Sequence, residues 1–409
     1  MKKIFLMLAA TAIAFSVVSC NGTSSKGNTV TVWAMGAEGL ALGQMISKFE
    51  EQNPDIKIDL QAIPWDVADQ NIMMAVATGD GPDVIGMGST WVANYGKVGA
   101  LLDFTPYVDQ HPIFSPDNYF DGTLETAIVD GKLVGIPWYV ETRVLFYRTD
   151  ILREVGRNRP PETWDELLQV SRAMGNRGTG FFGLDIDPKN SDMTIMLARQ
   201  NGSRLIDTET NTALFNQPEF VDAVRFVNQF FKEGHSDASG MYTGTFPFGD
   251  GYIPMQITGP WSINTIMDLA PEIAGKFSLA MLPMGPLNRT SVMGGSHLVV
   301  LKSAKNIDGA MQFIDFLVQP ENQIAFFETV NALPSNIHAW ELDSALNTEP
   351  IYGVLGEQLK DAVPYPTVGA WETIFLELHK AMERINIGGE DIQTVMDETN
   401  ATAQNLLDR

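Results

Sequence analysis

The fold is decided by residues 29–87, which read TVTVWAMGAEGLALGQMISKFEEQNPDIKIDLQAIPWDVADQNIMMAVATGDGPDVIGM. Short runs rich in β-branched residues alternate there with longer segments whose apolar residues recur at helical spacing. The predicted order is strand, helix, strand, helix and strand, over residues 29–33, 40–51, 55–63, 67–78 and 83–87. Strands that alternate with helices in this way predict an α/β fold, with a parallel sheet covered by helices on both faces.

Local signals support these boundaries. Four apolar residues share one face of the first helix, namely Leu42, Met45, Ile46 and Phe49. Asn53-Pro54 ends this helix, because the residue before a proline avoids helical backbone angles. Residues 55–63, DIKIDLQAI, alternate between polar and apolar types, which indicates a half-buried strand.

A second block of the same α/β type is predicted for residues 143–293. Thr163 and Glu166 have the spacing of a capping box, in which each side chain accepts from a backbone amide at the start of a helix. Residues 253–258 form a predicted buried strand that ends in GPW at 259–261. Further helices are predicted over 307–318, 321–330, 373–385 and 392–407.

The composition excludes several classes of protein. The 409 residues are enough for two domains, and 44% apolar with 19% charged residues is a globular composition. Asp and Glu total 50 against 27 Lys and Arg, a net charge of −23, which disfavours binding to nucleic acid or to anionic lipid headgroups. One cysteine excludes a disulfide framework and a cysteine-cluster metal site, and five scattered histidines disfavour a histidine-rich one. We expect no metal and no cofactor.

The first twenty residues, MKKIFLMLAATAIAFSVVSC, have the pattern of an export signal. Lys2 and Lys3 precede an apolar run that is too short to span a bilayer comfortably. The run ends in VVSC, which resembles a bacterial lipobox and so implies removal of residues 1–19 and lipidation of Cys20. Residues 20–28 would then be a polar, lipidated tether. The alternative is an ordinary secretory signal with an incidental cysteine; either way we expect an exported protein.

Sequences that begin like catalytic or metal-binding motifs are incomplete. GGSHL at 294–298 starts as a nucleophile elbow but lacks the closing glycine. GTGFFG at 178–183 matches GxGxxG, but it follows a predicted helix rather than a strand. Asp185 and Asp187 hint at a calcium loop, yet the required glycine is absent and Met196 stands in place of the bidentate glutamate. We therefore expect a binding protein rather than an enzyme.

Tryptophans lie at or just past the ends of predicted strands. Trp33 closes the first strand, and the others lie beyond later strands, at Trp65, Trp91 and Trp261. Ligands of open α/β sheets bind beyond the carboxyl ends of the strands, so this placement predicts an aromatic-lined cleft. Indole packs on the C–H faces of a sugar ring, and the sugar hydroxyls then need polar partners. Candidate polar partners are Glu38, Asp66, Ser89, Thr90, Glu141 and Arg143.

Other interpretations of these residues stay open. Large aromatic side chains commonly fill cores, so we assign Trp33 and Trp164 to cores and leave Trp138 and Trp340 undecided. Acidic and aromatic groups also suit a cation such as a polyamine, and a cleft of this kind also suits a polyol. A pair of carboxylates would serve an exported glycosidase, which needs two acids across the scissile bond.

Seven stretches together resemble the extracellular solute-binding proteins of ABC sugar importers, the family that includes maltose-binding protein. They are ISKFE (46–50), ATGDGPDV (77–84), GKLVGIP (131–137), YRTDIL (147–152), PETWDEL (161–167), GPW (259–261) and GGS (294–296). Each is weak alone, but their order and spacing are specific and cover essentially the whole mature chain.

The resemblance implies two lobes of the type II periplasmic-binding-protein fold, joined by three crossovers and closing on a ligand. It places the crossovers near residues 140–142, 293–296 and 333–336. The implied N-lobe comprises residues 28–140 plus 297–333, and the implied C-lobe comprises 143–293 plus 336–409. Such a protein is a monomeric receptor, periplasmic or at the cell surface, that delivers a mono- or oligosaccharide to an ABC permease.

The resemblance also implies roles for single residues. Glu141 matches a carboxylate that binds sugar hydroxyls at the hinge, and Trp261 matches a stacking tryptophan, with Trp371 near another one. Thr90 and Trp91 stand where maltose binders have an aspartate and an arginine, which argues against maltose itself. The full candidate set for ligand binding is Glu38, Trp65, Thr90, Trp91, Glu141, Trp261, Ser296 and Trp371.

Overall fold

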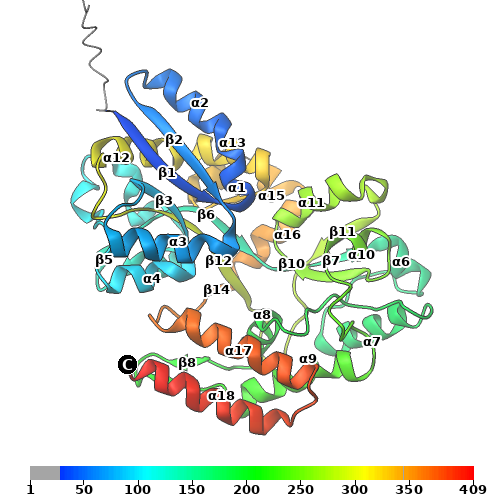
Figure 1. Cartoon of the computed structure of the whole chain (residues 1–409). Helices are drawn as coiled ribbons and strands as arrows, with labels where there is room; N and C mark the ends of the chain where they lie inside the picture. The colour runs from blue at the N-terminus through cyan, green and yellow to red at the C-terminus, as the bar shows by residue number, and fades with distance from the viewer. Residues whose placement is uncertain (1–27, 344) are drawn as a thin grey trace, which may run out of the picture.

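The computed structural model describes residues 28–343 and 345–409, which form two lobes of mixed α/β structure (Figure 1). The expectation of an α/β fold with two lobes is confirmed. The predicted export signal and Cys20 lie outside the described residues. Within the described part of the chain, no helix has both the length and the apolar character needed to cross a membrane.

A seven-stranded sheet forms the centre of the N-lobe, in the order β13-β6-β12-β3-β1-β2, with β14 paired to β12. Its strands are β1 (Thr29–Met35), β2 (Lys57–Ile63), β3 (Val84–Gly88), β6 (Ile136–Thr142), β12 (Ser291–Val300), β13 (Leu333–Pro334) and β14 (Ala362–Pro364). The strands predicted within residues 29–87 are therefore present, displaced by at most a few residues.

The sheet is parallel only in part. β1 pairs in parallel with β2 and β3, as the alternating pattern predicts. β12, however, runs antiparallel to both β3 and β6. The parallel pairing predicted for residues 29–87 is therefore confirmed, and the antiparallel strand is an addition from outside that segment, because β12 enters the sheet from the opposite end after the chain has passed through the second lobe.

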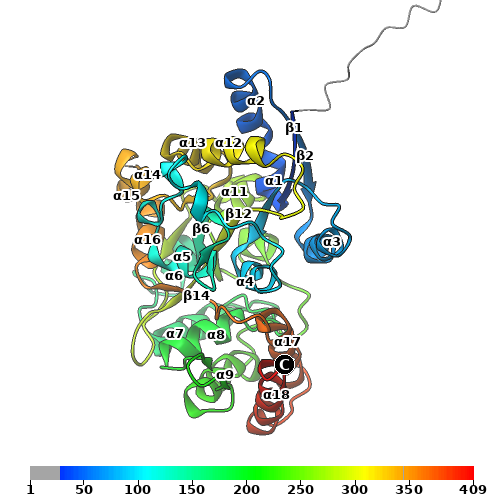
Figure 2. The ribbon, with the colours of Figure 1, turned by 90° about the vertical axis from the view of Figure 1, so that its left-hand side faces the viewer.

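Helices cover both faces of this sheet (Figure 2). Phe49 and Phe313 pack with Val30 and Val32 on one face, while Ile72 packs on the other. The helices of this lobe are α1 (Gly36–Ala41), α2 (Gly43–Gln52), α3 (Trp65–Thr78), α4 (Ser89–Lys97), α5 (Asp121–Ala127), α12 (Ile307–Leu317) and α13 (Pro320–Val330), beside the β4 (Ile128–Val129) and β5 (Lys132–Leu133) hairpin.

The first predicted helix, 40–51, is two helices in the structure. Gly36 has φ +59°, a left-handed angle that glycine adopts readily, so the chain turns from β1 directly into α1. This early turn brings Glu38 to the end of the strand.

The C-lobe is built on a three-stranded sheet, β10 (Met255–Thr258), β7 (Val144–Arg148) and β11 (Phe277–Ala280). β7 lies in the middle and runs antiparallel to both neighbours. The prediction of a second parallel block was therefore wrong. The apolar pattern of a buried strand reports burial but not direction, so the sequence could not distinguish the two arrangements.

Helices pack around this second sheet, and a core that includes Phe220, Phe230 and Trp371 fills the space between them. They are α6 (Thr149–Glu154), α7 (Trp164–Gly175), α8 (Asp192–Gln200), α9 (Pro218–Lys232), α10 (Thr245–Gly249), α11 (Trp261–Leu269), α17 (Trp371–Asn386) and α18 (Ile392–Leu407), with a β8 (Ile206–Asp207) and β9 (Thr212–Ala213) hairpin.

The capping box predicted at α7 is half formed. The Thr163 hydroxyl accepts from the Glu166 amide at 3.2 Å, as expected. The Glu166 carboxylate accepts instead from the Glu162 amide at 2.8 Å and pairs with Arg159.

Hydrogen bonds tie together the strands that run between the lobes. β6 continues through Arg143 into β7, and the Thr142 hydroxyl donates to the Val292 carbonyl of β12 at 3.0 Å. The Ser291 hydroxyl accepts from the Arg143 amide and donates to its carbonyl. A third apolar cluster at this junction receives α14 (Ile337–Leu342), α15 (Ala345–Thr348) and α16 (Pro350–Leu359). The residue limits proposed for the lobes stay a prediction.

Asp83 anchors the N-lobe, which gives a stability prediction. Its carboxylate is 3% exposed and accepts from the Thr31 amide and hydroxyl and from the Lys305 and Asn306 amides. Burial raises the pKa of Asp83, but these hydrogen bonds outweigh burial and leave it lowered. We expect Asp83→Asn to lower the free energy of unfolding by about 2–3 kcal/mol, because an amide nitrogen would face amide donors.

The loss should appear in urea unfolding at pH 7 and shrink as the pH falls through the lowered pKa of Asp83, where the wild-type carboxylate becomes protonated. Asp80→Asn is the control, since Asp80 forms an exposed ion pair with Lys305 and its replacement should leave the unfolding midpoint unchanged. Equal effects of the two substitutions would contradict the anchoring role of Asp83.

Candidate functional site

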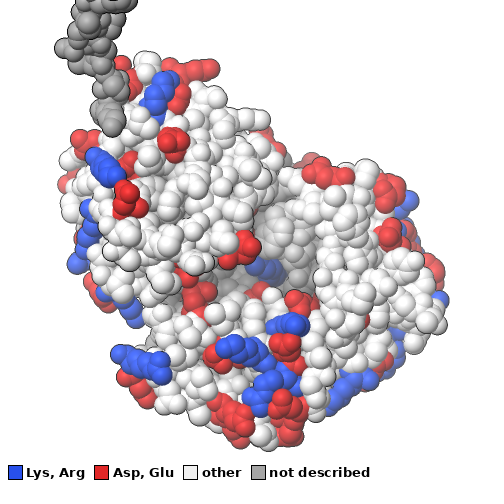
Figure 3. Space-filling model, viewed as in Figure 1, with Lys and Arg blue, Asp and Glu red and all other residues white. Residues whose placement is uncertain are grey.

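A cleft lies between the two lobes and appears as a hollow in the space-filling view (Figure 3). Three adjoining cavities of about 530, 370 and 260 Å³ make up this cleft. They share lining residues. Trp261 borders the 530 and 370 Å³ cavities, Arg143 borders the 370 and 260 Å³ cavities, and Glu141 borders the 530 and 260 Å³ cavities. We call the 370 Å³ cavity the C-lobe arm, and the other two the hinge cavity (530 Å³) and the aromatic cavity (260 Å³).

The centre of the cleft is Arg143, which lies where β6 passes into β7. Its guanidinium carbon is 4.5 Å from the centroid of the Trp261 ring, and its Nη1 atom is 3.4 Å from Oε1 of Glu141. Burial lowers the pKa of Arg143, but Glu141 and the other nearby acidic groups raise it by more. The pKa therefore lies above its ordinary value, and the guanidinium stays charged. Arg143 thus holds a carboxylate and an indole side by side.

The Gly-Pro-Trp stretch sets the position of this indole. Trp261 is the first residue of α11, directly after β10 and the turn at Gly259-Pro260. A Cβ atom at Gly259 would lie 1.9 Å from the Trp261 ring, so only glycine lets the indole fold back over the turn.

Two more tryptophans form the N-lobe wall of the cleft. Trp65 begins α3 and Trp91 lies in α4, and their rings meet edge to face with centroids 5.5 Å apart. Trp65 is 39% exposed, which leaves part of its surface open to the cleft. A Cβ atom at Gly36 would lie 2.4 Å from its indole nitrogen, so the glycine that turns β1 into α1 also makes room for this ring.

Three carboxylates line the hinge cavity together with the indoles of Trp65 and Trp261, namely those of Glu38, Glu141 and Asp268. Burial raises the pKa of Glu38 to about 7; a backbone hydrogen bond opposes this and the charge of Glu141 adds to it. Near neutral pH the Glu38 carboxyl group can therefore donate a hydrogen bond as well as accept one.

Glu372 lines the aromatic cavity and was missed by the sequence analysis. It comes from the first turn of α17 and faces α4 of the other lobe. Burial raises its pKa, while hydrogen bonds with Thr90 and Trp91 act in the opposite direction. No local signal marks Glu372, because its partners are about 280 positions away in the chain.

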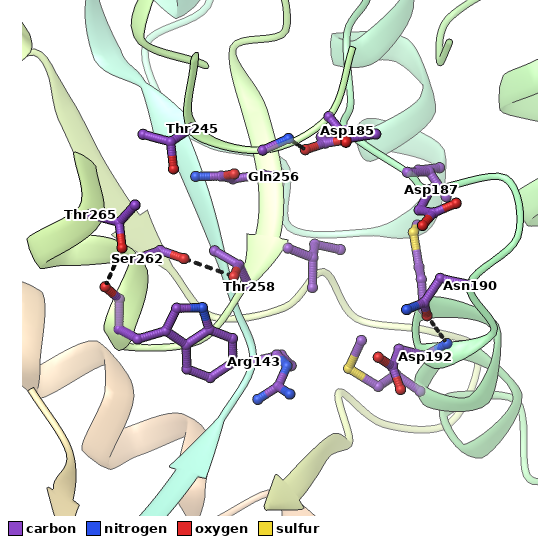
Figure 4. A pocket seen from close by; sticks show the side chains of 17 residues that line it. Arg143, Asp185, Asp187, Asn190, Asp192, Thr245, Gln256, Thr258, Ser262 and Thr265 are labelled. Carbon is purple, nitrogen blue, oxygen red and sulfur yellow. Dashed lines mark hydrogen bonds between the residues drawn. The ribbon is translucent and has the colours of Figure 1, made fainter. Parts of the chain in front are cut away.

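The C-lobe arm, drawn in Figure 4, was also missed by the sequence analysis, although the sequence contained one signal for it. Asp185 and Asp187 line it, and the sequence had brought them forward only as an incomplete calcium loop. Among the described residues, no group of three or more Asp, Glu, His or Cys side chains is arranged to hold a metal ion. The two aspartates lie in the cleft wall as polar lining residues.

The structure brings most of the predicted site residues together. The cleft is lined by Glu38, Trp65, Thr90, Trp91, Glu141, Trp261 and Trp371. Trp371, however, is 1% exposed and packs beside Tyr365 and Phe375, so it presents little surface for stacking.

Ser296 was wrongly included in the set. It is 1% exposed, and its hydroxyl donates to the Met87 carbonyl at 2.9 Å. The hydroxyl therefore bonds the backbone of the neighbouring strand β3, and the side chain does not line the three cavities.

The remaining tryptophans have structural contacts. Trp33 and Trp164 are half-buried: Trp33 packs against a core cluster of the N-lobe, and Trp164 stacks on Phe226 beside the C-lobe core. Trp138, left undecided, is buried in the N-lobe core. The Trp340 indole donates to the Pro334 carbonyl.

This fold and cleft define a two-lobed binding protein, and comparison with known proteins gives its family. Residues 34–324 match the model of the bacterial extracellular solute-binding proteins, and the chain belongs to that family. The resemblance stated from the sequence motifs is thereby confirmed.

Individual relatives agree with this assignment. The sugar-binding protein MalE of Xanthomonas citri superposes with a TM-score of 0.84 and 31% identity, over 93% of this chain and 98% of that one. The galactooligosaccharide-binding protein of Bacillus subtilis is 23% identical, over 98% of this chain and 97% of its own. The maltodextrin-binding protein of the same organism is 24% identical, over 100% and 99%.

The raised pKa of Glu38 gives a pH prediction. An acid whose pKa is higher in the folded than in the unfolded state destabilises the fold as the pH rises from its ordinary value of 4.5 to about 7. We expect the wild type to lose stability over this range relative to Glu38→Gln, which keeps the shape but does not ionise. Melting temperatures of both proteins measured from pH 4 to 8 test this, and parallel curves would show that Glu38 titrates normally.

Proposed function

We propose that this protein captures a carbohydrate outside the cytoplasmic membrane and delivers it to the permease of an ABC importer. The observation that carries the proposal is the meeting of indole rings and carboxylates in one cleft, with Trp261 and Glu141 both held by Arg143. Indole provides an apolar surface for the faces of a sugar ring, and carboxylates accept hydrogen bonds from its hydroxyls.

The relatives support a carbohydrate as the ligand. The X. citri protein is a sugar-binding protein, and the two B. subtilis proteins bind galactooligosaccharides and maltodextrins. These ligands differ from one another, so they support the class of ligand rather than a particular sugar.

The proposed mechanism is closure of the lobes. Glu38 and Trp65 belong to the N-lobe wall and Trp261 to the C-lobe wall, so a ligand between them contacts both. A ligand that contacts both lobes binds the closed form more tightly and shifts the equilibrium toward it by that difference in affinity. The permease then distinguishes the closed form from the open one.

We also propose that the ligand leaves chemically unchanged. A glycosidase would need two carboxylates across the scissile bond; Glu38 and Glu141 line one cavity, and Glu141 pairs there with Arg143. Release of shorter sugars during incubation with oligosaccharides would contradict this.

Trp261→Ala tests the stacking role of this residue. We expect the affinity for the bound sugar to fall by about 1–3 kcal/mol, because the stacking surface is lost. Isothermal titration calorimetry with the sugar found in a thermal-shift screen measures the change, since a ligand of the native state raises the melting temperature.

Phe246→Ala is the control for this substitution. Phe246 is an exposed aromatic residue of the C-lobe that does not line the described cavities, so its removal should leave the affinity unchanged. An unchanged affinity in folded Trp261→Ala would remove Trp261 from the binding site.

The location of the protein rests on Cys20, the one cysteine of the chain. We propose that lipid attached to Cys20 holds a monomeric receptor at a membrane surface. Cys20→Ser should then release the protein from the membrane fraction without changing its melting temperature. Metabolic labelling with palmitate measures the lipid directly, and labelling of Cys20→Ser equal to that of the wild type would disprove the anchor.

A further inference from the structure

A groove of about 620 Å³ lies outside the cleft, at the end of the N-lobe remote from the C-lobe. It is bordered by the last turns of α2, residues 110–111, the later part of α12 and the start of α13. Figure 1 and Figure 2 both place α2 and α12 at this end of the lobe. We call this cavity the N-lobe groove. It shares no lining residue with the three cavities of the cleft, and its volume falls within the range of small-molecule sites.

Lys48 gives the N-lobe groove a cation that is held in place by uncharged groups. Its Nζ atom donates to Oδ1 of Asn322 at 2.7 Å and lies 5.9 Å from the centroid of the Phe316 ring. Asn322 is only 6% exposed, and its own amide donates to the Phe316 carbonyl, so this partner is fixed. Lys48 forms no ion pair within the described part of the chain. Two of its three N–H donors are therefore available to an anion.

Glu321 gives the same groove a carboxylate. It lies in the first turn of α13, directly before Asn322, and it is exposed. Its carboxylate has neither an ion pair nor a hydrogen bond with any other described residue. Lys48 and Glu321 thus line one groove without pairing with each other. Opposite charges in this arrangement match a ligand that carries both an anion and a cation.

The other polar groups of the groove divide into committed and uncommitted ones. Both oxygens of Asp315 are used, because His111 Nδ1 lies 2.7 Å from one and Gln319 Nε2 donates to the other at 2.8 Å. This contact orients the imidazole and leaves its Nε2 atom for a ligand. Three exposed lining amides form no side-chain hydrogen bond with the described residues, namely those of Gln52, Gln110 and Gln312.

The groove lies close to the start of the described chain. The Asn28 side chain donates to the carbonyl of Asp55, two residues after Asn53, which lines the groove. Cys20 precedes Asn28 by eight residues, and eight residues span at most about 28 Å. A lipid on Cys20 would therefore keep a membrane surface within reach of this end of the N-lobe.

We propose that the N-lobe groove binds the phosphoethanolamine headgroup of a membrane lipid, with the phosphate on Lys48 and the ammonium on Glu321. The net charge of −23 disfavours anionic headgroups, whereas a headgroup with no net charge can approach this surface. A weak site suffices, because the anchor would hold it at a high local concentration of headgroups. This inference rests on the lipid anchor proposed at Cys20 and does not depend on which sugar the cleft binds.

The test uses the mature chain, residues 20–409, with Cys20→Ser, which carries no lipid and cannot bind a vesicle through an anchor. Flotation measures its binding to vesicles of phosphatidylcholine alone, or mixed in equal parts with phosphatidylethanolamine or with phosphatidylglycerol. We expect the most binding with phosphatidylethanolamine, because the quaternary ammonium of choline has no N–H to donate. Calorimetry with glycerophosphoethanolamine measures binding of the soluble headgroup.

Lys48→Gln and Glu321→Gln remove one charge each and keep the length of the side chain or nearly so. We expect each to weaken binding about tenfold, because each loses a charge-assisted hydrogen bond. Lys57→Gln and Glu328→Gln are the matched controls. Lys57 lies near the same end of the lobe but pairs with Glu50, and Glu328 lies two turns further along α13. Neither lines the groove, so both controls should bind like the parent chain.

The outcomes are distinct. Preference for phosphatidylethanolamine that both groove variants weaken and both controls keep supports the proposal. Equal binding to all vesicles, preference for phosphatidylglycerol, no binding, or insensitivity to the groove variants overturns it. Capture of glycerophosphoethanolamine without vesicle binding also overturns it, because the groove would then take a soluble ligand. Failure of the carbohydrate function would appear separately, in calorimetry of the same chains with sugars, and failure of the anchor in palmitate labelling.

Discussion

The contact on which the cleft depends is the one between Arg143, Glu141 and Trp261. Arg143 lies at the passage from β6 to β7, so the backbone that joins the lobes also carries the charge that holds a carboxylate from one strand and an indole from the other lobe. Both partners are held without needing a ligand to order them. A preorganised surface of this kind loses less conformational entropy when a ligand binds.

The second feature of the cleft is a set of buried carboxyl groups whose pKa values are raised by burial. Burial raises the pKa of Glu38 in the hinge cavity, of Glu372 in the aromatic cavity and of Asp185 in the C-lobe arm. Each of these acids lies in a different cavity, so a need for hydrogen-bond donors runs along the whole cleft. A polyhydroxylated ligand supplies such donors at regular intervals without introducing a charge that must itself be desolvated.

Glycines connect the motifs to the site. Gly36 and Gly259 allow Trp65 and Trp261 to occupy space that a Cβ atom would fill. The GDGPDV stretch, which carried part of the family resemblance, has a structural purpose instead: its Asp83 joins β1 to the start of α12. The motifs thus include both the walls of the cleft and the frame that holds them.

The sequence by itself determined the elements of residues 29–87, the α/β class and the tryptophans at strand ends, because periodicity and strand termini are local properties. The two-lobed arrangement followed from the resemblance carried by the seven motifs. It placed Ser296 in the cleft wrongly, since the direction of a side chain depends on strand register. Only the tertiary structure decided the antiparallel course of β12 and the site of Glu372. The residues around this side chain are distant in the chain. The side chain needs hydrogen-bond partners because it is largely buried, and it becomes buried only once the lobes have packed.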